Sequence, residues 1–201
     1  MSAPPSRPSS HSHPSPHPAP PPPLDAAAQA VALLRTLGAE AVPHPGGTLL
    51  AHLWRVRGRL AGWQARPALQ LAGLCHAFYG TDGFPQPLLP LDRRPELTSL
   101  IGPEAEAVVY AYAACDRPRT YPGLPTPGAS LHDRFTGGTR PLNARLRRDL
   151  AELTAANELD LAHTDPAFRT TRAAPLLALF TSLRPLLTPA AWQDCETTLS
   201  P

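Results

Sequence analysis

Two histidines occupy positions from which both side chains could bind one metal ion. His52 follows Leu49 by three residues and precedes Val56 by four, which places it on the apolar stripe of a predicted helix. His76 follows Ala72 by four residues at the end of another apolar segment. Buried imidazoles need partners, and a shared cation would supply them at once. The alternative for each histidine is a hydrogen-bonded place in the core.

Asp116 is the third candidate ligand. It ends a predicted helix, four residues after Tyr112 and seven after Val109, and therefore lies on the same helical face as both. A carboxylate there is costly to bury unless it is paired or ligated. Arg117 and Arg119 lie beside it, so a solvated helix end is the alternative. Spacing alone does not choose between the two.

The elements that would position these residues are helices, and the predicted fold class is all-α. Apolar residues recur at helical spacing, whereas alternating β-branched runs are absent. Most connections are short enough for a compact bundle. The predicted helices cover residues 26–38, about 48–60, 67–78, 94–101, 103–113, 142–162 and 173–187, with a last one from 189 and a long loop over 118–141.

A proline-rich tail precedes this domain. Residues 1–23 contain ten of the 28 prolines and no large aliphatic side chain, so they are predicted to be disordered, with the helical domain over 24–201. The tail lacks the apolar run of a signal peptide, and no stretch reaches 18 apolar residues. The three cysteines are widely spaced, which is typical of buried free thiols. We therefore expect a cytoplasmic protein that does not enter membranes.

The order of the candidate residues resembles the HD superfamily of helical metal-dependent phosphohydrolases. The stretches HPGGTLLAHLWRV, LAGLCHAFYGTDGF, LIGPEAEAVVYAYAACDR and DLAELTAANELD together resemble a group of small bacterial HD-like domains of unknown function, over residues 44–160. The resemblance implies a compact HD-like bundle and a divalent metal ion (zinc, manganese or iron) held by His52, His76 and Asp116.

One position departs from the family pattern. Ala77 stands where the HD family has the aspartate that bridges two metals, so the resemblance implies a mononuclear site or a site that has lost its metal. Asp82, six residues after His76, would by the same resemblance be a general acid–base or a further ligand. The alternative is that Asp82 belongs to an ordinary turn with Gly83.

The long loop carries the candidate substrate-binding residues, Arg134 and Arg140. They flank two glycines, and arginine forks match phosphate oxygens, so an anionic substrate is expected. The alternative is a solvated flap, because all 18 basic residues of the chain are arginine. His44 precedes a glycine turn; we expect it at the surface, with entry into the site as the alternative.

Two functions remain open. The first is a metal-dependent hydrolase of a small phosphorylated substrate, and HD-like folds also host iron oxygenases. The second is a degenerate, noncatalytic HD-like domain that binds a ligand or partner; Ala77 favours it, while His52 and His76 favour the first. Asn157 and Glu158 interrupt an apolar helix face, where they would complete a polar pocket; the alternative is a side-chain hydrogen bond to the backbone. A net charge of +2 points to no particular partner, and no nucleic acid is expected.

Overall fold

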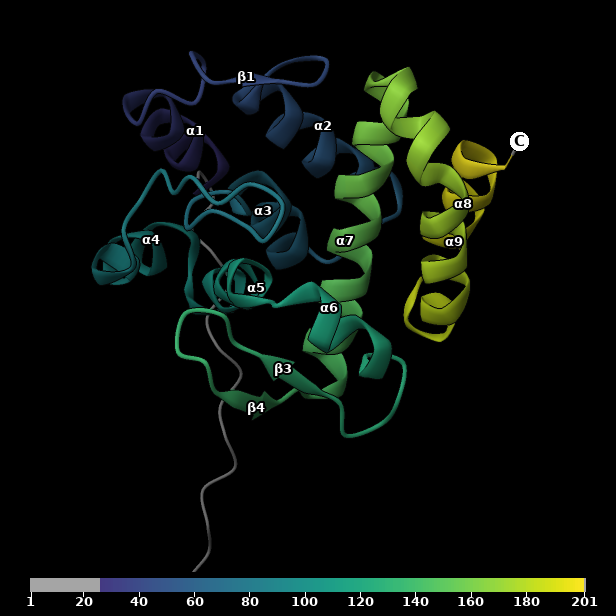
Figure 1. The fold of residues 1–201 in the computed structure, drawn as a ribbon. Coiled ribbons are helices and arrows are strands. Elements are labelled where there is room, and N and C mark those ends of the chain that lie inside the picture. Colours follow the sequence, from purple (N-terminus) through teal and green to yellow (C-terminus); the bar gives the residue numbers. More distant parts are fainter. Residues whose placement is uncertain (1–25, 201) are drawn as a thin grey trace, which may run out of the picture.

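Helices make up most of residues 26–200, the part of the chain that our computed structural model describes (Figure 1). The all-α fold class is confirmed, and the predicted tail over 1–23 lies outside the described residues. The helices are α1 (Ala26–Thr36), α2 (Leu49–Gly62), α3 (Pro67–Cys75), α4 (Arg94–Ile101), α5 (Pro103–Ala114), α6 (Arg117–Thr120), α7 (Ala144–Thr164), α8 (Pro166–Leu183) and α9 (Pro189–Leu199), with 3-10 turns at Leu91–Arg93, Tyr121–Gly123 and Arg184–Leu186.

Prolines set where several helices begin. Pro67, Pro103, Pro166 and Pro189 each take the first helical position, where the missing N–H is not needed. α8 begins at Pro166 rather than near residue 173, as we had predicted from its apolar residues. The Asp165 carboxylate accepts hydrogen bonds from two backbone N–H groups of the first turn, and this cap starts the helix within a polar stretch.

Two short antiparallel sheets interrupt the helical pattern. β1 (Pro43–His44) pairs with β2 (Gly47–Thr48), and β3 (Ser130–His132) pairs with β4 (Thr139–Pro141). The prediction of a structureless loop over 118–141 was therefore wrong: this segment forms most of α6, a 3-10 turn and the β3–β4 hairpin. Its strands are too short for an alternating pattern to be recognised in the sequence.

α7 lies at the centre of the arrangement. Figure 1 shows it between the group formed by α1 to α5 and the pair α8 and α9, and it contacts α2, α3, α5, α8 and α9. Most of its side chains are buried, including the polar Asn157, Glu158 and Asp160. α7 therefore supplies buried polar side chains at its contacts with neighbouring helices.

α3 packs tightly against α2 at Gly73. A β-carbon at this position would lie 2.5 Å from Leu60 Cδ1, so only glycine lets the two helices meet here without displacement. His76 directly follows α3 and is 3% exposed, while His52 on α2 is 1% exposed. The two histidines thus belong to segments that pack tightly against each other.

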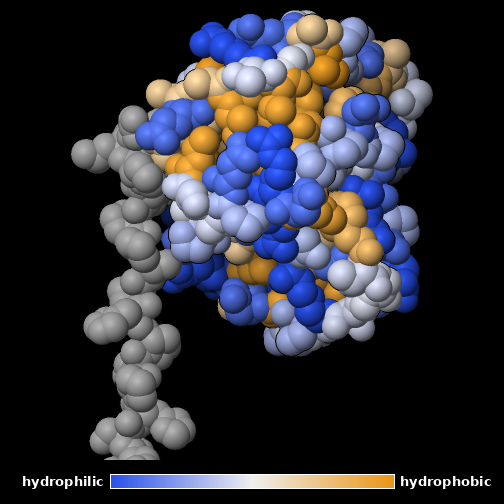
Figure 2. Space-filling view, turned by 90° about the vertical axis from the view of Figure 1, so that its left-hand side faces the viewer, coloured by the Kyte–Doolittle hydropathy of each residue, from blue (hydrophilic) through white to orange (hydrophobic). Residues whose placement is uncertain are grey.

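Two further features of the described chain are its surface and its free thiols. Figure 2 shows the side of the molecule on which α1 and α4 lie, where hydrophobic patches adjoin hydrophilic side chains. Among the large hydrophobic residues of the described chain, only Trp54 is exposed. No helix within residues 26–200 has the length and apolar character needed to cross a bilayer. Cys75, Cys115 and Cys195 are buried and free, which confirms that expectation.

Candidate functional site

Three histidine rings meet where α2, the end of α3 and β1 converge. The ring of His44 stacks on that of His52 with 4.1 Å between centroids. The ring of His76 stands edge-on to His52 at 5.3 Å. The expectation of a surface position for His44 was therefore wrong, because the β1–β2 turn folds its ring onto the inward face of α2.

α7 supplies the polar partners of His52. The Nδ1 atom of His52 lies 2.6 Å from Asp160 Oδ2, and the Nε2 atom of His52 lies 3.1 Å from Asn157 Oδ1. The amide of Asn157 is oriented by its own nitrogen, which donates to Glu158 Oε1. Both ring nitrogens of His52 face side-chain oxygens of α7, so both are engaged within this network.

Two arginines form ion pairs with the two acidic side chains of α7 that lie near the histidines. Arg55 donates from Nε and Nη2 to the two oxygens of Asp160, at 2.7 and 3.0 Å. Burial raises the pKa of the Asp160 carboxyl, but hydrogen bonds from His52 and Arg55 outweigh it and leave the pKa below the usual value. Arg117 donates to Glu158 at 2.9 Å and to the Tyr112 hydroxyl.

The other two histidines are held neutral. His76 Nδ1 donates to the Gly73 carbonyl at 2.8 Å, so Nε2 carries the lone pair. Burial, followed by the charge of His52, lowers the pKa of His76 to about 3. The same two causes, in the same order, lower the pKa of His44 to about 4. A neutral imidazole with an unengaged lone pair can accept a proton, a hydrogen bond or a metal ion.

These side chains line a cavity of about 420 Å³. Its wall is formed by the β1–β2 turn, α2, the loop after α3, α7 and the start of α8, and includes His44, His52, His76, Ala77, Phe84, Arg117, Asn157, Glu158, Phe168 and Arg172. The expectation that Asn157 and Glu158 complete a polar pocket is confirmed. Two buried nitrogens of the lining residues, His44 Nδ1 and Arg117 Nε, find no hydrogen-bond partner among the described residues.

The predicted ligand set is only partly assembled. The structure brings His52 and His76 together, but Asp116 does not line the cavity; its carboxylate accepts the Arg119 N–H as the N-cap of α6. Ala77 lines the cavity without a carboxylate. Within residues 26–200, no three His, Cys, Asp or Glu side chains are grouped as a metal ion would need. Both nitrogens of His52 are also engaged, so the arrangement does not fit the ligands that the resemblance implies.

The remaining predicted residues lie around the cavity or away from it. Asp82 accepts the Arg117 backbone N–H at 3.3 Å and does not line this cavity. Arg134 and Arg140 belong to the β3–β4 hairpin and also lie outside the lining. Arg134 donates to the Ala113 carbonyl, and the guanidinium of Arg140 lies 5.1 Å from the ring centre of Tyr110. Their roles in substrate binding stay predictions.

Our sequence reasoning missed Asp160, Arg55 and Arg117 as members of the site. Asp160 follows Asn157 by three residues, and Arg55 follows His52 by three, so helical spacing carried a signal for both. Arg117 was considered only as a neighbour of Asp116. Its direction depends on the bend between α5 and α6, which leaves no periodic pattern.

Part of the chain is similar to a known protein family. Residues 33–117 are similar to a family described as a domain of unknown function (DUF6817). No curated protein and no solved structure matches the chain. The matched segment includes the three histidines and Arg117 but ends before α7, which supplies the acidic and amide partners of the site.

Proposed function

We propose that this chain is a ligand-binding domain whose histidine-lined cavity takes a small organic anion. The charges on the cavity wall support this. On the wall, Glu158 is paired with Arg117, while Asp160, which does not line the cavity, is paired with Arg55 and His52. Arg172, exposed on α8, lines the cavity without an ion-pair partner among the described residues. The wall therefore has an excess of positive charge.

The observation that carries the proposal is Arg172, which lines the cavity without an acidic partner in the described chain. Arg117 lines the same cavity, and its Nε is a buried donor without an acceptor among the described residues. Carboxylate or phosphate oxygens in the cavity would be bound by the free guanidinium fork of Arg172 and attracted by the positive charge of Arg117.

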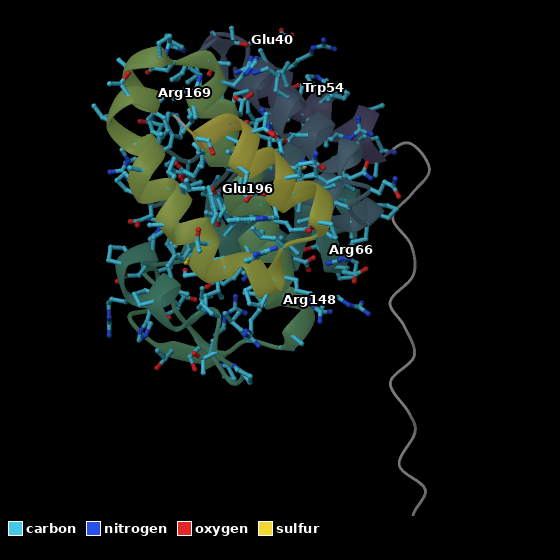
Figure 3. All side chains as sticks on the ribbon, turned by 90° about the vertical axis from the view of Figure 1, so that its right-hand side faces the viewer. Glu40, Trp54, Arg66, Arg148, Arg169 and Glu196 are labelled. Carbon is cyan, nitrogen blue, oxygen red and sulfur yellow. The ribbon has the colours of Figure 1, made fainter. Side chains whose placement is uncertain are left out.

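Isothermal titration of the full chain with acetate and inorganic phosphate tests the proposal. We compare Arg172→Gln with Arg169→Gln, a matched control three residues earlier on α8 that lies outside the cavity lining. Figure 3 looks onto α8 and α9 and labels Arg169. Loss of a charge-assisted contact should weaken binding about tenfold in the first variant only. Equal effects of both variants, or no binding of either anion, would contradict the proposal.

Metal-dependent hydrolysis of a small phosphorylated substrate is the second candidate. One observation favours it: His76 lines the cavity, and its Nε2 carries a free lone pair that could bind a metal ion. Two observations weigh against the predicted ligand set. Both ring nitrogens of His52 already contact side chains of α7, and the Asp116 carboxylate accepts the Arg119 N–H instead. The test is the zinc, manganese and iron content of the purified protein, together with phosphomonoester hydrolysis before and after Ala77→Asp. Stoichiometric metal with turnover would replace the binding proposal.

A further inference from the structure

A second cavity, of about 500 Å³, adjoins the first. The two share four lining residues, Gly83, Arg117, Glu158 and Arg172. Each has a volume within the ~300–1,000 Å³ typical of small-molecule sites. The shared residues make the two cavities neighbouring parts of one cleft that runs along α8.

The second cavity differs from the first in its chemistry. Apart from the shared residues and the polar Asp82, Thr154 and Ser182, its wall is formed by side chains of α8, of α6 and of the turn after α6, namely Leu176, Leu179, Pro118, Tyr121 and Pro122. The Tyr121 hydroxyl is already hydrogen-bonded to Thr154 Oγ1 at 3.0 Å. This part of the wall therefore favours apolar ligand atoms over polar ones.

The side chains of α8 follow the same change along one helical face. Phe168 and Arg172 line the histidine cavity, and Arg172, Leu176 and Leu179 line the second cavity. Residues 168, 172, 176 and 179 are spaced by four, four and three, so they lie on one face of the helix. This face of α8 thus runs from Arg172, which lines the histidine cavity, to Leu176 and Leu179, which line the second cavity.

We propose that the ligand is amphipathic: an organic anion whose charged group lies in the histidine cavity and whose apolar body lies between α8 and the Tyr121–Gly123 turn. This rests on the proposed function, because it assigns the anionic group to the same cavity. It adds the apolar body as the feature that selects one organic acid over another.

A series of carboxylates tests this inference on the full chain by isothermal titration. Acetate, butyrate, hexanoate and octanoate share a headgroup and differ only in chain length. If added methylenes enter the apolar cavity, affinity should rise about twofold to fourfold per methylene, because the free energy gained by burying one methylene corresponds to roughly that ratio of dissociation constants. 1-Octanol, which has the same chain without the charge, should bind at least about tenfold more weakly than octanoate.

Two tryptophan variants locate the apolar chain. Ser182 is exposed and lines the second cavity, whereas its exposed neighbour Thr181 does not. Ser182→Trp should fill the apolar end and remove the gain from chain length, while acetate binding stays unchanged. Thr181→Trp, with the same substituent on the same helix, should behave as wild type. Circular dichroism of both variants checks that α8 is retained.

The outcomes separate the two proposals. Acetate binding without any dependence on chain length would overturn the amphipathic ligand and leave the anion-binding function in place. Octanol binding equal to that of octanoate would overturn the anionic headgroup and the proposed function with it. A gain from chain length that persists in Ser182→Trp would show that the apolar chain lies elsewhere and would also overturn the inference.

Discussion

Removing the Asp160 carboxylate charge is the sharpest test of the network behind the cavity. In Asp160→Asn the shape is kept, but His52 loses the charge that faces its Nδ1 at 2.6 Å. The side chains of His52 and Asp160 are 1% and 2% exposed, so solvent cannot replace the lost partner. Breaking a buried pair costs about 3–5 kcal/mol; an asparagine oxygen still accepts one hydrogen bond, so we expect about 3 kcal/mol near pH 5.5.

The loss should depend on pH in a defined direction. Burial raises the pKa of the Asp160 carboxyl, but hydrogen bonds from His52 and Arg55 outweigh it and hold the pKa below the usual value. A carboxyl whose folded pKa lies below its unfolded value contributes stability that is complete well above ~pH 4 and is lost as pH falls through the folded pKa. In Asp160→Asn we therefore expect a smaller loss near pH 3 than near pH 5.5.

Urea denaturation of wild type and variant at the two pH values measures the effect. Asp194→Asn is the matched control: Asp194 also accepts from an arginine, Arg59, but its side chain is 28% exposed. A partly exposed pair contributes about 0–1 kcal/mol, so this control should lose little at either pH. A loss below about 1 kcal/mol in Asp160→Asn near pH 5.5 would refute the importance of the buried contact between His52 and Asp160.

Two further predictions concern the same core. Burial and the charge of His52 lower the pKa of His76 to about 3, and a base whose folded pKa lies below its unfolded value loses stability as pH falls below about 6.5. Urea denaturation between about pH 6.5 and 4.5 should therefore show a slope that His76→Gln reduces by ~1.4 kcal/mol per pH unit; an unchanged slope would refute a neutral His76. Gly73→Ala should cost about 1–3 kcal/mol because its Cβ would meet Leu60, whereas Gly58→Ala in open space on α2 should gain about 0.5–1; thermal melts that order the two variants otherwise would contradict the close packing.

The helices and the pairing of the two histidines could be predicted because both depend on short-range periodicity. His52 shares a stripe with Leu49 and Val56, and His76 lies one turn above Gly73, so inward positions follow from spacing. α2 and α3 are consecutive and packed together, and two inward residues on them therefore come close. The role of the two side chains as metal ligands stays a prediction.

The rest of the site depends on features that leave no periodic signal. Asp116 was predicted on the helical face of Val109 and Tyr112, but α5 ends at Ala114, and Asp116 has an extended backbone from which its carboxylate caps α6. Asp160 and Asn157 reach His52 across more than 100 residues of sequence, and nothing local indicates which helix packs there. The β3–β4 hairpin likewise takes Arg134 and Arg140 to the side of α5 and away from the cavity.

The cleft separates the charges that hold the fold from the charge that meets the ligand. Asp160, His52 and Glu158 are buried and paired, so their substitution should change stability first and binding only as a consequence. Arg172 is exposed and has no ion pair in the described chain, so its loss should change affinity with little effect on stability. A site held by an already paired network loses less conformational entropy when a ligand binds. The structure therefore requires that Asp160→Asn and Arg172→Gln differ in kind: the first lowers the free energy of unfolding, and the second lowers the affinity for anions.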